Sequence, residues 1–557
     1  MIRITDMPIK KLILLIFTLR HLKPIQFFWR IYLKLNGLIP FDSTVPAHIR
    51  YQKLTLLPAT VKPTSLIDGQ FVFLNHASPY AQPVNWNDAQ QAKLWLYNLH
   101  YFDYLNQADI AYDTALMLML DWIEQNPVGR GNGWEPYTLS LRVVNWIKFL
   151  SSHSVEKDLP AIQASLFVQC RFLFRHLEYH LLGNHLFKNG VALIYGGAYF
   201  QGLEATTWLQ KGVSIIETEV REQVLGDGGH FERSPMYHLL ILEDVLDCLN
   251  IHQAAPCFNE ASLSALQEKA TRMLAFAADT LHPDGDIAFF NDSALGIAPP
   301  PNDLFAYASR LGLTIMPVLA SSNIDVIEKV DFGLYVLKNA SGRMIIDAGA
   351  IGPDYLPGHA HCDTLSYELS LFGKRCIVNS GTYQYAGRER NDFRATAAHN
   401  TVQIDAEEQH EIWSTFRVAR RGYPFDVSVI QQTDRVKFSA AHSGYQRLPG
   451  HPVHRRTVIC EANSWQVLDK IEGQGLHEAQ SFIHLHPAVQ IMAANDSDVI
   501  CHIGDERFAI HLTGGAKLDI IDSVYSPEFG LKLSNKTLRL RAQNACPFEI
   551  SYTITII

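Results

Sequence analysis

The stretch DTALMLMLDWIEQ at residues 113–125 first decides the fold. Its apolar residues recur with helical spacing, which is typical of a helix that buries one face. The pattern stops at Asn126-Pro127, because proline cannot continue a helix. The sequence therefore predicts an amphipathic helix here, and the same spacing continues further along the chain.

Further helices are predicted from about residue 88 to 315 by the same period. They cover residues 138–150, 161–182, 184–200, 208–224, 236–250 and 261–280. Many successive amphipathic helices with short connections indicate antiparallel hairpins, stacked into a toroid or a solenoid. Periodicity alone leaves these two arrangements open.

The period changes after about residue 325, where short β-rich runs alternate with Asn, Asp, Gly and Pro. The runs lie at residues 332–338, 343–348, 365–372, 375–378, 401–404, 425–431, 453–460, 465–471, 508–512 and 550–556. Regular short strands over about 230 residues are typical of a large antiparallel sandwich. A helical part followed by a β-sandwich is therefore expected.

The composition limits the classes of function. A chain of 557 residues is too long for one hydrophobic core, so two or more domains are expected. A net charge of −9 argues against a nucleic-acid binder, although a local basic cleft can still bind a polyanion. The eight cysteines form no CxxC pair, which favours buried free thiols and leaves disulfides open.

The N-terminus combines basic and apolar residues. Lys10 and Lys11 precede an apolar run at residues 12–19, which is too short to span a bilayer. No small-residue cleavage site follows, so a cleaved signal peptide is disfavoured. Peripheral membrane contact through a basic amphipathic helix and plain packing on a domain both stay open. A periplasmic, a cytoplasmic and a membrane-peripheral location stay open with them, as does the oligomeric state.

Two helix starts concentrate polar residues. Asn184 begins a predicted helix, and an N-cap is its alternative interpretation. Ser234-Pro235 begins another, with Ser as cap and Pro at the first position. Tyr237 then lies in the first turn, where the helix dipole would favour tyrosinate. A packed core tyrosine is the alternative there.

Two further segments concentrate histidine and arginine. His359 and His361 form an HxH pair, whose rings point to one side of an extended chain and suit either two metal ligands or one ligand beside a catalytic residue. Arg388, Arg390 and Arg394 form a local basic loop, for which a solvated face is the alternative.

The order and spacing of these motifs resemble the heparinase II/III-like polysaccharide lyases. The matching pieces are WEPYTLSLRVVNW at 134–146, GNHLFKNG at 183–190, DGGHFERSPMYH at 227–238, GHAHCDTLSYELSLFGKRCIVNSGTY at 358–383 and RNDFRATAAHNTV at 390–402. The resemblance implies an α+β multidomain chain. A basic amphipathic segment at residues 1–60 would precede an (α/α) toroid at 61–320 and an antiparallel β-sandwich at 325–557.

The resemblance also implies an enzyme, a carbon–oxygen lyase that cleaves an acidic, uronic-acid-containing polysaccharide by β-elimination. Such an enzyme removes the C5 proton, breaks the C4–O bond and leaves an unsaturated sugar. It must first neutralise the uronate carboxylate, whose charge resists the negative charge that develops at C5. A base and an acid then serve C5 and O4. A uronate C5-epimerase and a non-catalytic glycan-binding protein of polysaccharide assembly are the alternatives.

The resemblance assigns roles to individual residues. Asn184 would bind the carboxylate, His185 would act as base or second donor, Tyr237 would be the catalytic tyrosine, and His359 would help to neutralise the acid. Since Phe393 stands where some relatives carry a second tyrosine, a single-tyrosine mechanism is expected. The residues expected to bind substrate are Arg388, Arg394, Arg417 and Trp134.

The resemblance further implies a structural zinc ion and no organic cofactor. Its ligands would be His361, Asn379 and His399, of which the two histidines suit zinc. The family commonly has Asp where this chain has Asn379. Either a metal ion or hydrogen bonding by Asn379 is therefore open at this position.

Overall fold

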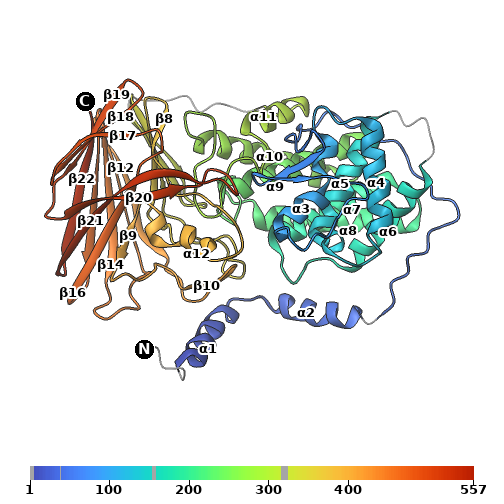
Figure 1. The fold of residues 1–557 in the computed structure, drawn as a ribbon, viewed down its shortest axis with the longest axis horizontal. Coiled ribbons are helices and arrows are strands. Elements are labelled where there is room, and N and C mark those ends of the chain that lie inside the picture. Colours follow the sequence, from blue (N-terminus) through green and yellow to red (C-terminus); the bar gives the residue numbers. More distant parts are fainter. Residues whose placement is uncertain (1–5, 38, 154–158, 315–323) are drawn as a thin grey trace.

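A helical lobe and a β-lobe lie side by side in the computed structural model (Figure 1). The structure describes residues 6–37, 39–153, 159–314 and 324–557. The N-terminal helices α1 (Asp6–Leu19) and α2 (Pro24–Asn36) run along the lower edge of both lobes in this view.

The helical lobe begins with a small antiparallel sheet, which the sequence pattern did not predict. Its strands are β1 (Leu66–Ile67), β2 (Gln70–Phe73) and β3 (His76–Pro79). The helices that follow are α3 (Lys93–Tyr101), α4 (Tyr112–Gln125), α5 (Pro136–Ser152), α6 (Pro160–Arg175), α7 (Gly183–Tyr199), α8 (Leu203–Gln223), α9 (Pro235–Ala254), α10 (Glu260–Thr280) and α11 (Pro301–Arg310). The predicted helix at 161–182 ends earlier, at Arg175, and a tight turn then leads into α7.

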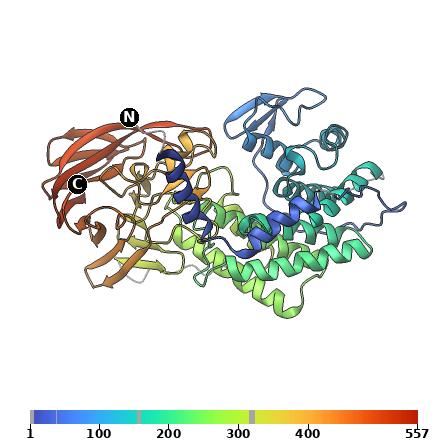
Figure 2. The ribbon, with the colours of Figure 1, turned by 90° about the horizontal axis from the view of Figure 1, so that it is seen from below.

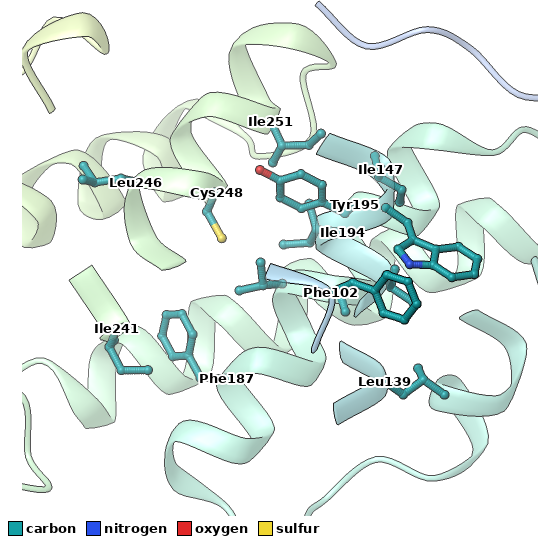
Figure 3. Close-up of a cluster of buried hydrophobic side chains, with 14 of the residues drawn as sticks. Phe102, Leu139, Ile147, Phe187, Ile194, Tyr195, Ile241, Leu246, Cys248 and Ile251 are labelled. Carbon is teal, nitrogen blue, oxygen red and sulfur yellow. The ribbon is translucent and has the colours of Figure 1, made fainter. Parts of the chain in front are cut away.

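Helix α7 is the centre of this lobe, because almost its whole length is buried against α5, α8 and α9. Its contact with α8 is close: a Cβ on Gly212 would lie 2.7 Å from the carbonyl oxygen of Gly190. Figure 3 shows the apolar core around α7, with Phe187, Ile194 and Tyr195 facing residues of the neighbouring helices. This packing holds the first turn of α7 in place.

The β-lobe consists of antiparallel sheets. In the described part of the chain these are a five-stranded sheet in the order β4-β5-β6-β7-β8, an eight-stranded sheet β12-β13-β14-β15-β22-β19-β18-β17 and a four-stranded sheet β20-β21-β16-β9. β10 and β11 form a separate hairpin. One apolar core joins the inner faces of the three larger sheets, so the predicted helical part and antiparallel sandwich are confirmed.

The bounds of the β-lobe elements follow the chain. They are β4 (Asp325–Lys329), β5 (Leu334–Lys338), β6 (Gly342–Asp347), β7 (Tyr367–Leu371), β8 (Lys374–Ile377), α12 (Glu389–Arg394), β9 (Val402–Ile404), β10 (Ile412–Ser414), β11 (Arg417–Val418), β12 (Pro424–Gln431), β13 (Arg435–His442), β14 (Val453–Glu461), β15 (Ser464–Glu472), β16 (Leu476–His484), β17 (Gln490–Ala494), β18 (Asp498–Ile503), β19 (Glu506–Leu512), β20 (Lys517–Tyr525), β21 (Leu533–Ala545) and β22 (Phe548–Ile556).

The two lobes are joined by a small apolar cluster. Phe276 of α10 packs against Phe332, with 4.8 Å between the ring centroids, and Phe290 belongs to the same cluster. The eight cysteines of the chain are free thiols, and most are buried. The junction between the lobes is held by this packing and by ion pairs such as that of Lys329 with Asp279 at 2.8 Å, and it places the loop after α10 beside the loops of the β-lobe.

Candidate active site

The first turns of two helices meet a loop of the β-lobe. Asn184 lies in the first turn of α7 and Tyr237 in the first turn of α9, while His359 belongs to the loop between β6 and β7. The helix start predicted at Ser234-Pro235 is confirmed, because the Ser234 hydroxyl accepts the Tyr237 backbone N–H at 3.2 Å. Asn184 is not an N-cap, since its side chain bonds outside the helix.

Glu232 connects Asn184 to His359. The Asn184 amide nitrogen donates to both carboxylate oxygens of Glu232 at 3.0 and 2.9 Å, and the Asn184 backbone N–H donates at 2.8 Å. His359 Nε2 lies 3.2 Å from Glu232 Oε2. The sequence motif at 227–238 contains Glu232, although the residue was not singled out. It fixes the two predicted carboxylate-binding groups relative to each other.

Asp292, in the loop after α10, gathers both rings of the HxH pair. Its carboxylate lies 2.9 Å from His359 Nδ1 and 2.9 Å from His361 Nε2. The Arg390 guanidinium pairs with the same carboxylate through both terminal nitrogens. Asp292 and Arg390 are fully buried. The two rings of the HxH pair do lie on one side of the chain, as predicted, but they bind the Asp292 carboxylate there.

Tyr237 lies against His359 and contacts a second tyrosine. The rings of Tyr237 and His359 are 3.8 Å apart between centroids. The Tyr237 hydroxyl lies 3.2 Å from the hydroxyl of Tyr385, in the loop between β8 and α12. The sequence did not predict Tyr385, because the resemblance places a second tyrosine at the position that Phe393 occupies. The site therefore has a pair of phenols, one from each lobe.

His185 has a different environment from its neighbour Asn184. Its Nδ1 lies 3.0 Å from Glu178 Oε1, and its ring lies 4.5 Å from the ring of Tyr137 between centroids. A carboxyl oxygen at Nδ1 favours the tautomer in which Nδ1 carries the proton and Nε2 holds a lone pair. One third of the His185 side chain is exposed. His185 can therefore accept a proton through Nε2.

The electrostatics of the site are set by burial and by these contacts. Burial opposes the protonated form of His359, but hydrogen bonds with Asp292 and Glu232 raise its pKa to about 9. Burial alone would raise the pKa of Glu232, yet His359 and the Asn184 backbone hold it at about 2. His359 is thus an imidazolium at neutral pH between two carboxylates.

Tyr237 is neutral in this environment. Burial raises the pKa of Tyr237 well above its usual value, and Tyr385 and Tyr137 raise it further. The helix dipole was expected to favour tyrosinate, but desolvation outweighs it here. Tyr237 therefore presents a phenol that can donate a proton.

Backbone strain surrounds the site. Leu182, Arg233 and Asn291 adopt positive φ angles of 67°, 57° and 53°, and each adjoins or nearly adjoins a site residue. Gly183 has φ +58°, and a Cβ there would lie 2.2 Å from a methyl carbon of Leu356 and 2.5 Å from Glu232 Oε1. Glycine is required at 183 because the β-lobe loop and Glu232 approach it closely.

The predicted substrate-binding residues separate into two groups. Trp134 is a core residue, whose ring packs on Trp122 and whose Nε1 donates to the Asn126 carbonyl at 3.2 Å. Arg394 is also buried, with its guanidinium donating to the carbonyls of Ala360, Ser414 and Thr415. Neither side chain is free to bind a sugar.

Arg388 and Arg417 are exposed, as their predicted role requires. Arg417 follows Phe416, whose ring is 46% exposed and lies 5.6 Å from the ring of Tyr385 between centroids. Sequence reasoning missed Phe416, because a single exposed aromatic in a hairpin has no period that marks it. The β10–β11 hairpin therefore places an aromatic face beside the phenol pair.

The three residues expected to bind zinc form a hydrogen-bonded chain. His361 Nδ1 lies 3.2 Å from His399 Nε2, and His399 Nδ1 lies 3.2 Å from Asn379 Oδ1 on the other edge of the ring. Asn379 Oδ1 also accepts from the Ser366 hydroxyl at 2.6 Å. A structural zinc takes four converging ligands. Only two nitrogens face each other here, and the described residues hold no group of three His, Cys, Asp or Glu that could bind a metal. This geometry does not fit the expected zinc site.

Comparison with known proteins places these features in a family. The model of the heparinase II/III N-terminus matches residues 61–298, and the model of the heparinase II/III-like C-terminal part matches residues 325–553. The heparin-sulfate lyase of Bacteroides stercoris is 30% identical over 316 residues, which are 52% of this chain and 44% of that protein. The heparin-sulfate lyase of Pedobacter heparinus is 26% identical over 322 residues, which are 51% of this chain and 47% of that protein.

The chain thus spans about half the length of these curated relatives. A crystal structure of heparinase III shares the fold, with a TM-score of 0.71 at 18% identity, and the match covers 95% of this chain and 89% of that one. Together the two family models account for most of the sequence, in the same order as the two lobes. The protein therefore belongs to the heparinase II/III family.

Proposed function

We propose that the protein is a polysaccharide lyase that cleaves a uronic-acid-containing glycan by β-elimination. The observation that carries the proposal is that Glu232 links Asn184 to His359 and that the ring of Tyr237 lies against the ring of His359. An amide, an imidazolium and a phenol are the groups that this reaction needs, and a packed core requires none of them together. The names of the curated relatives support the same reaction class.

Asn184 and His359 neutralise the uronate carboxylate in this proposal. The Asn184 amide has two N–H groups, and the 3.2 Å contact between His359 Nε2 and Glu232 is long enough to be shared with a substrate oxygen. A cation and an amide donor lower the cost of placing negative charge at C5. Glu232 acts as a positioning residue, because it holds both donors in place before the substrate binds.

His185 and Tyr237 move the protons. His185 Nε2 takes the C5 proton, the C5–H electrons form the C4–C5 double bond, and the C4–O4 bond breaks. The Tyr237 phenol gives its proton to O4, which leaves as a hydroxyl. His185 then returns a proton to the Tyr237 phenolate through solvent. Because Tyr237 is neutral in the free protein, it serves as the acid.

The proposed substrate is an acidic glycosaminoglycan. The exposed Phe416 offers a face for a sugar ring, and the exposed Arg388 and Arg417 offer guanidinium groups for carboxylate or sulfate. The relatives named heparin-sulfate lyase support this class. The assignment to a particular glycan depends on the test that follows.

A panel of uronic-acid polymers tests the reaction directly. Heparan sulfate, chondroitin sulfate and alginate would each be incubated with the protein, and the ultraviolet absorbance of the conjugated, unsaturated product would be followed. Absorbance that rises with at least one polymer supports the lyase. Deuterium from solvent entering C5 without cleavage would instead show an epimerase. Binding without either signal would show a non-catalytic glycan-binding protein.

The second phenol is expected to assist the first. In Tyr385→Phe the hydroxyl partner of Tyr237 is lost while the ring remains, so we expect kcat to fall roughly tenfold, less than for loss of an acid–base group itself. Steady-state rates on the best polymer of the panel check this. An unchanged kcat would show that the 3.2 Å contact between the hydroxyls has no part in proton transfer.

The charge of His359 predicts that activity falls at alkaline pH. With a pKa of about 9, His359 is protonated through neutral pH, and its ability to neutralise the substrate is lost as the pH rises through 9. We therefore expect kcat/KM, which reports the free enzyme, to decline above about pH 9. Protonated His359 also stabilises the fold, because its pKa is higher in the folded protein than in the unfolded chain. This stabilisation is complete below pH 6.5 and is lost as the pH rises through about 9. An identical decline in His359→Gln would contradict the assignment.

A further inference from the structure

Helices α1 and α2 form a strap over the lower face of both lobes, which is the face toward the viewer in Figure 2. We call residues 6–36 the N-terminal strap. Its inner side is held by specific contacts: Trp413 of the β-lobe donates to the Thr18 hydroxyl at 3.0 Å, and Trp29 stacks on Tyr179 of the helical lobe at 4.7 Å between centroids. The outer side of both helices therefore faces away from the protein.

The polarity of α2 is reversed relative to a surface helix in water. Its buried residues are the polar Gln26 and Asn36, which bond to carbonyls of the helical lobe. Phe28 and Ile31 are each 62% exposed, and Leu35 is exposed in the same stripe. An ordinary surface helix buries its apolar stripe and exposes its polar one. The outer stripe of α2 therefore exposes apolar side chains to water, where a surface helix would normally carry polar ones.

Helix α1 continues this apolar surface. Ile9, Leu12 and Ile16 are spaced by three and four residues, and all are more than half exposed. Among the described residues, no single helix is long and apolar enough to cross a membrane. The pair Ile9–Leu19 and Pro24–Asn36, bent by 106°, meets that criterion of length and composition only when taken together.

The charge of the strap is opposite to that of the whole protein. From Met7 to Phe41 the sequence has no acidic residue, although the full chain has a net charge of −9. The exposed basic residues of the strap are Lys10, Lys11, Arg20, Arg30 and Lys34. Apolar stripes flanked by lysine and arginine match the acyl and headgroup layers of an anionic membrane surface.

We propose that the outer face of the N-terminal strap binds the surface of a lipid bilayer that contains anionic headgroups. The helices lie in the plane of the interface: Phe28, Ile31 and Ile16 enter the acyl boundary, and the basic side chains meet phosphate. A contiguous exposed apolar patch rimmed by polar residues often marks an interaction site. The strap also contacts the hairpin that carries Phe416, so the bound membrane would lie beside the candidate active site.

Vesicle co-sedimentation of the full chain tests the proposal. The protein is expected to sediment with vesicles of phosphatidylcholine and phosphatidylglycerol, less with phosphatidylcholine alone, and less as salt is raised. Ile16→Glu combined with Ile31→Glu removes two apolar side chains that would enter the membrane and adds two negative charges, which anionic headgroups repel. From the bound fraction at a fixed lipid concentration, the partition coefficient of this variant should be at least about tenfold lower than that of the unmodified chain.

The matched control is Leu203→Glu, which changes an 89% exposed leucine on α8 and should sediment like the unmodified chain. Circular dichroism establishes that each variant is folded. The proposal is overturned if the unmodified chain stays in solution with anionic vesicles at low salt, or if the strap variant binds as well as the control. It is also overturned if light scattering shows a dimer that the strap variant dissociates and that binds no lipid, since a second copy would then cover this face.

Discussion

Tyr237→Phe is expected to lower kcat on the cleaved polymer by about 10²-fold or more, the usual scale for loss of an acid–base group. The ring of Tyr237 keeps its contact with the ring of His359 in this variant, and only the hydroxyl that faces Tyr385 is removed. Because no charge is buried or exposed, the fold should be unchanged. Initial rates from product absorbance, with KM measured separately, check the expectation.

The pattern of the kinetic change matters as much as its size. Loss of the proton donor should lower kcat while KM changes little, because the hydroxyl acts on O4 in the transition state. The control is Tyr104→Phe, which removes another buried phenol of the helical lobe, one whose hydroxyl donates to the Leu99 carbonyl. If Tyr237→Phe retained full activity, or if Tyr104→Phe lost as much, the assignment of Tyr237 as the acid would be wrong.

The sequence predicts a site residue only where a local pattern or a family motif accompanies that residue. The roles expected for Asn184 and Tyr237 come from the family resemblance, and the sequence by itself shows only that both residues lie at helix starts, which serine and proline mark for Tyr237. The HxH spacing draws attention to His359, and its expected role again comes from the resemblance. Asp292 has no such mark: it lies in a loop after α10, and only the packing of that loop against the β-lobe brings it to His359 and Arg390.

The same limit explains the residues that were misassigned. Trp134 and Arg394 have side chains that suit sugars and acids, but their burial depends on neighbours far along the chain, such as Phe172 and Ser414. The long helices were predicted from their regular apolar spacing. Strand β21 was not predicted, because its sequence is largely polar and only the middle of the strand is buried. Short-range patterns predict elements, and long-range packing decides which polar groups meet.

Asp292→Ala is expected to destabilise the protein by about 3–5 kcal/mol, the range for removing one partner of a buried ion pair. Asp292 and Arg390 are almost inaccessible to solvent, so the variant leaves the guanidinium with no carboxylate and His359 and His361 without their common acceptor. Burial by itself opposes ionisation of Asp292, yet Arg390 and the two histidines hold its pKa well below the usual range. The carboxylate is therefore ionised because those three partners surround it.

Urea unfolding of Asp292→Ala, followed by fluorescence, measures this loss at the junction of the lobes. Glu268→Ala is the control, since Glu268 pairs with Arg272 on the exposed face of α10 and such pairs contribute no more than about 0.5 kcal/mol. Adding Arg390→Met to Asp292→Ala removes the stranded cation and should recover part of the stability, though not all, because the two imidazoles still lack their acceptor. A midpoint for Asp292→Ala no lower than that of Glu268→Ala would mean that the ion pair does not hold the HxH loop against the helical lobe.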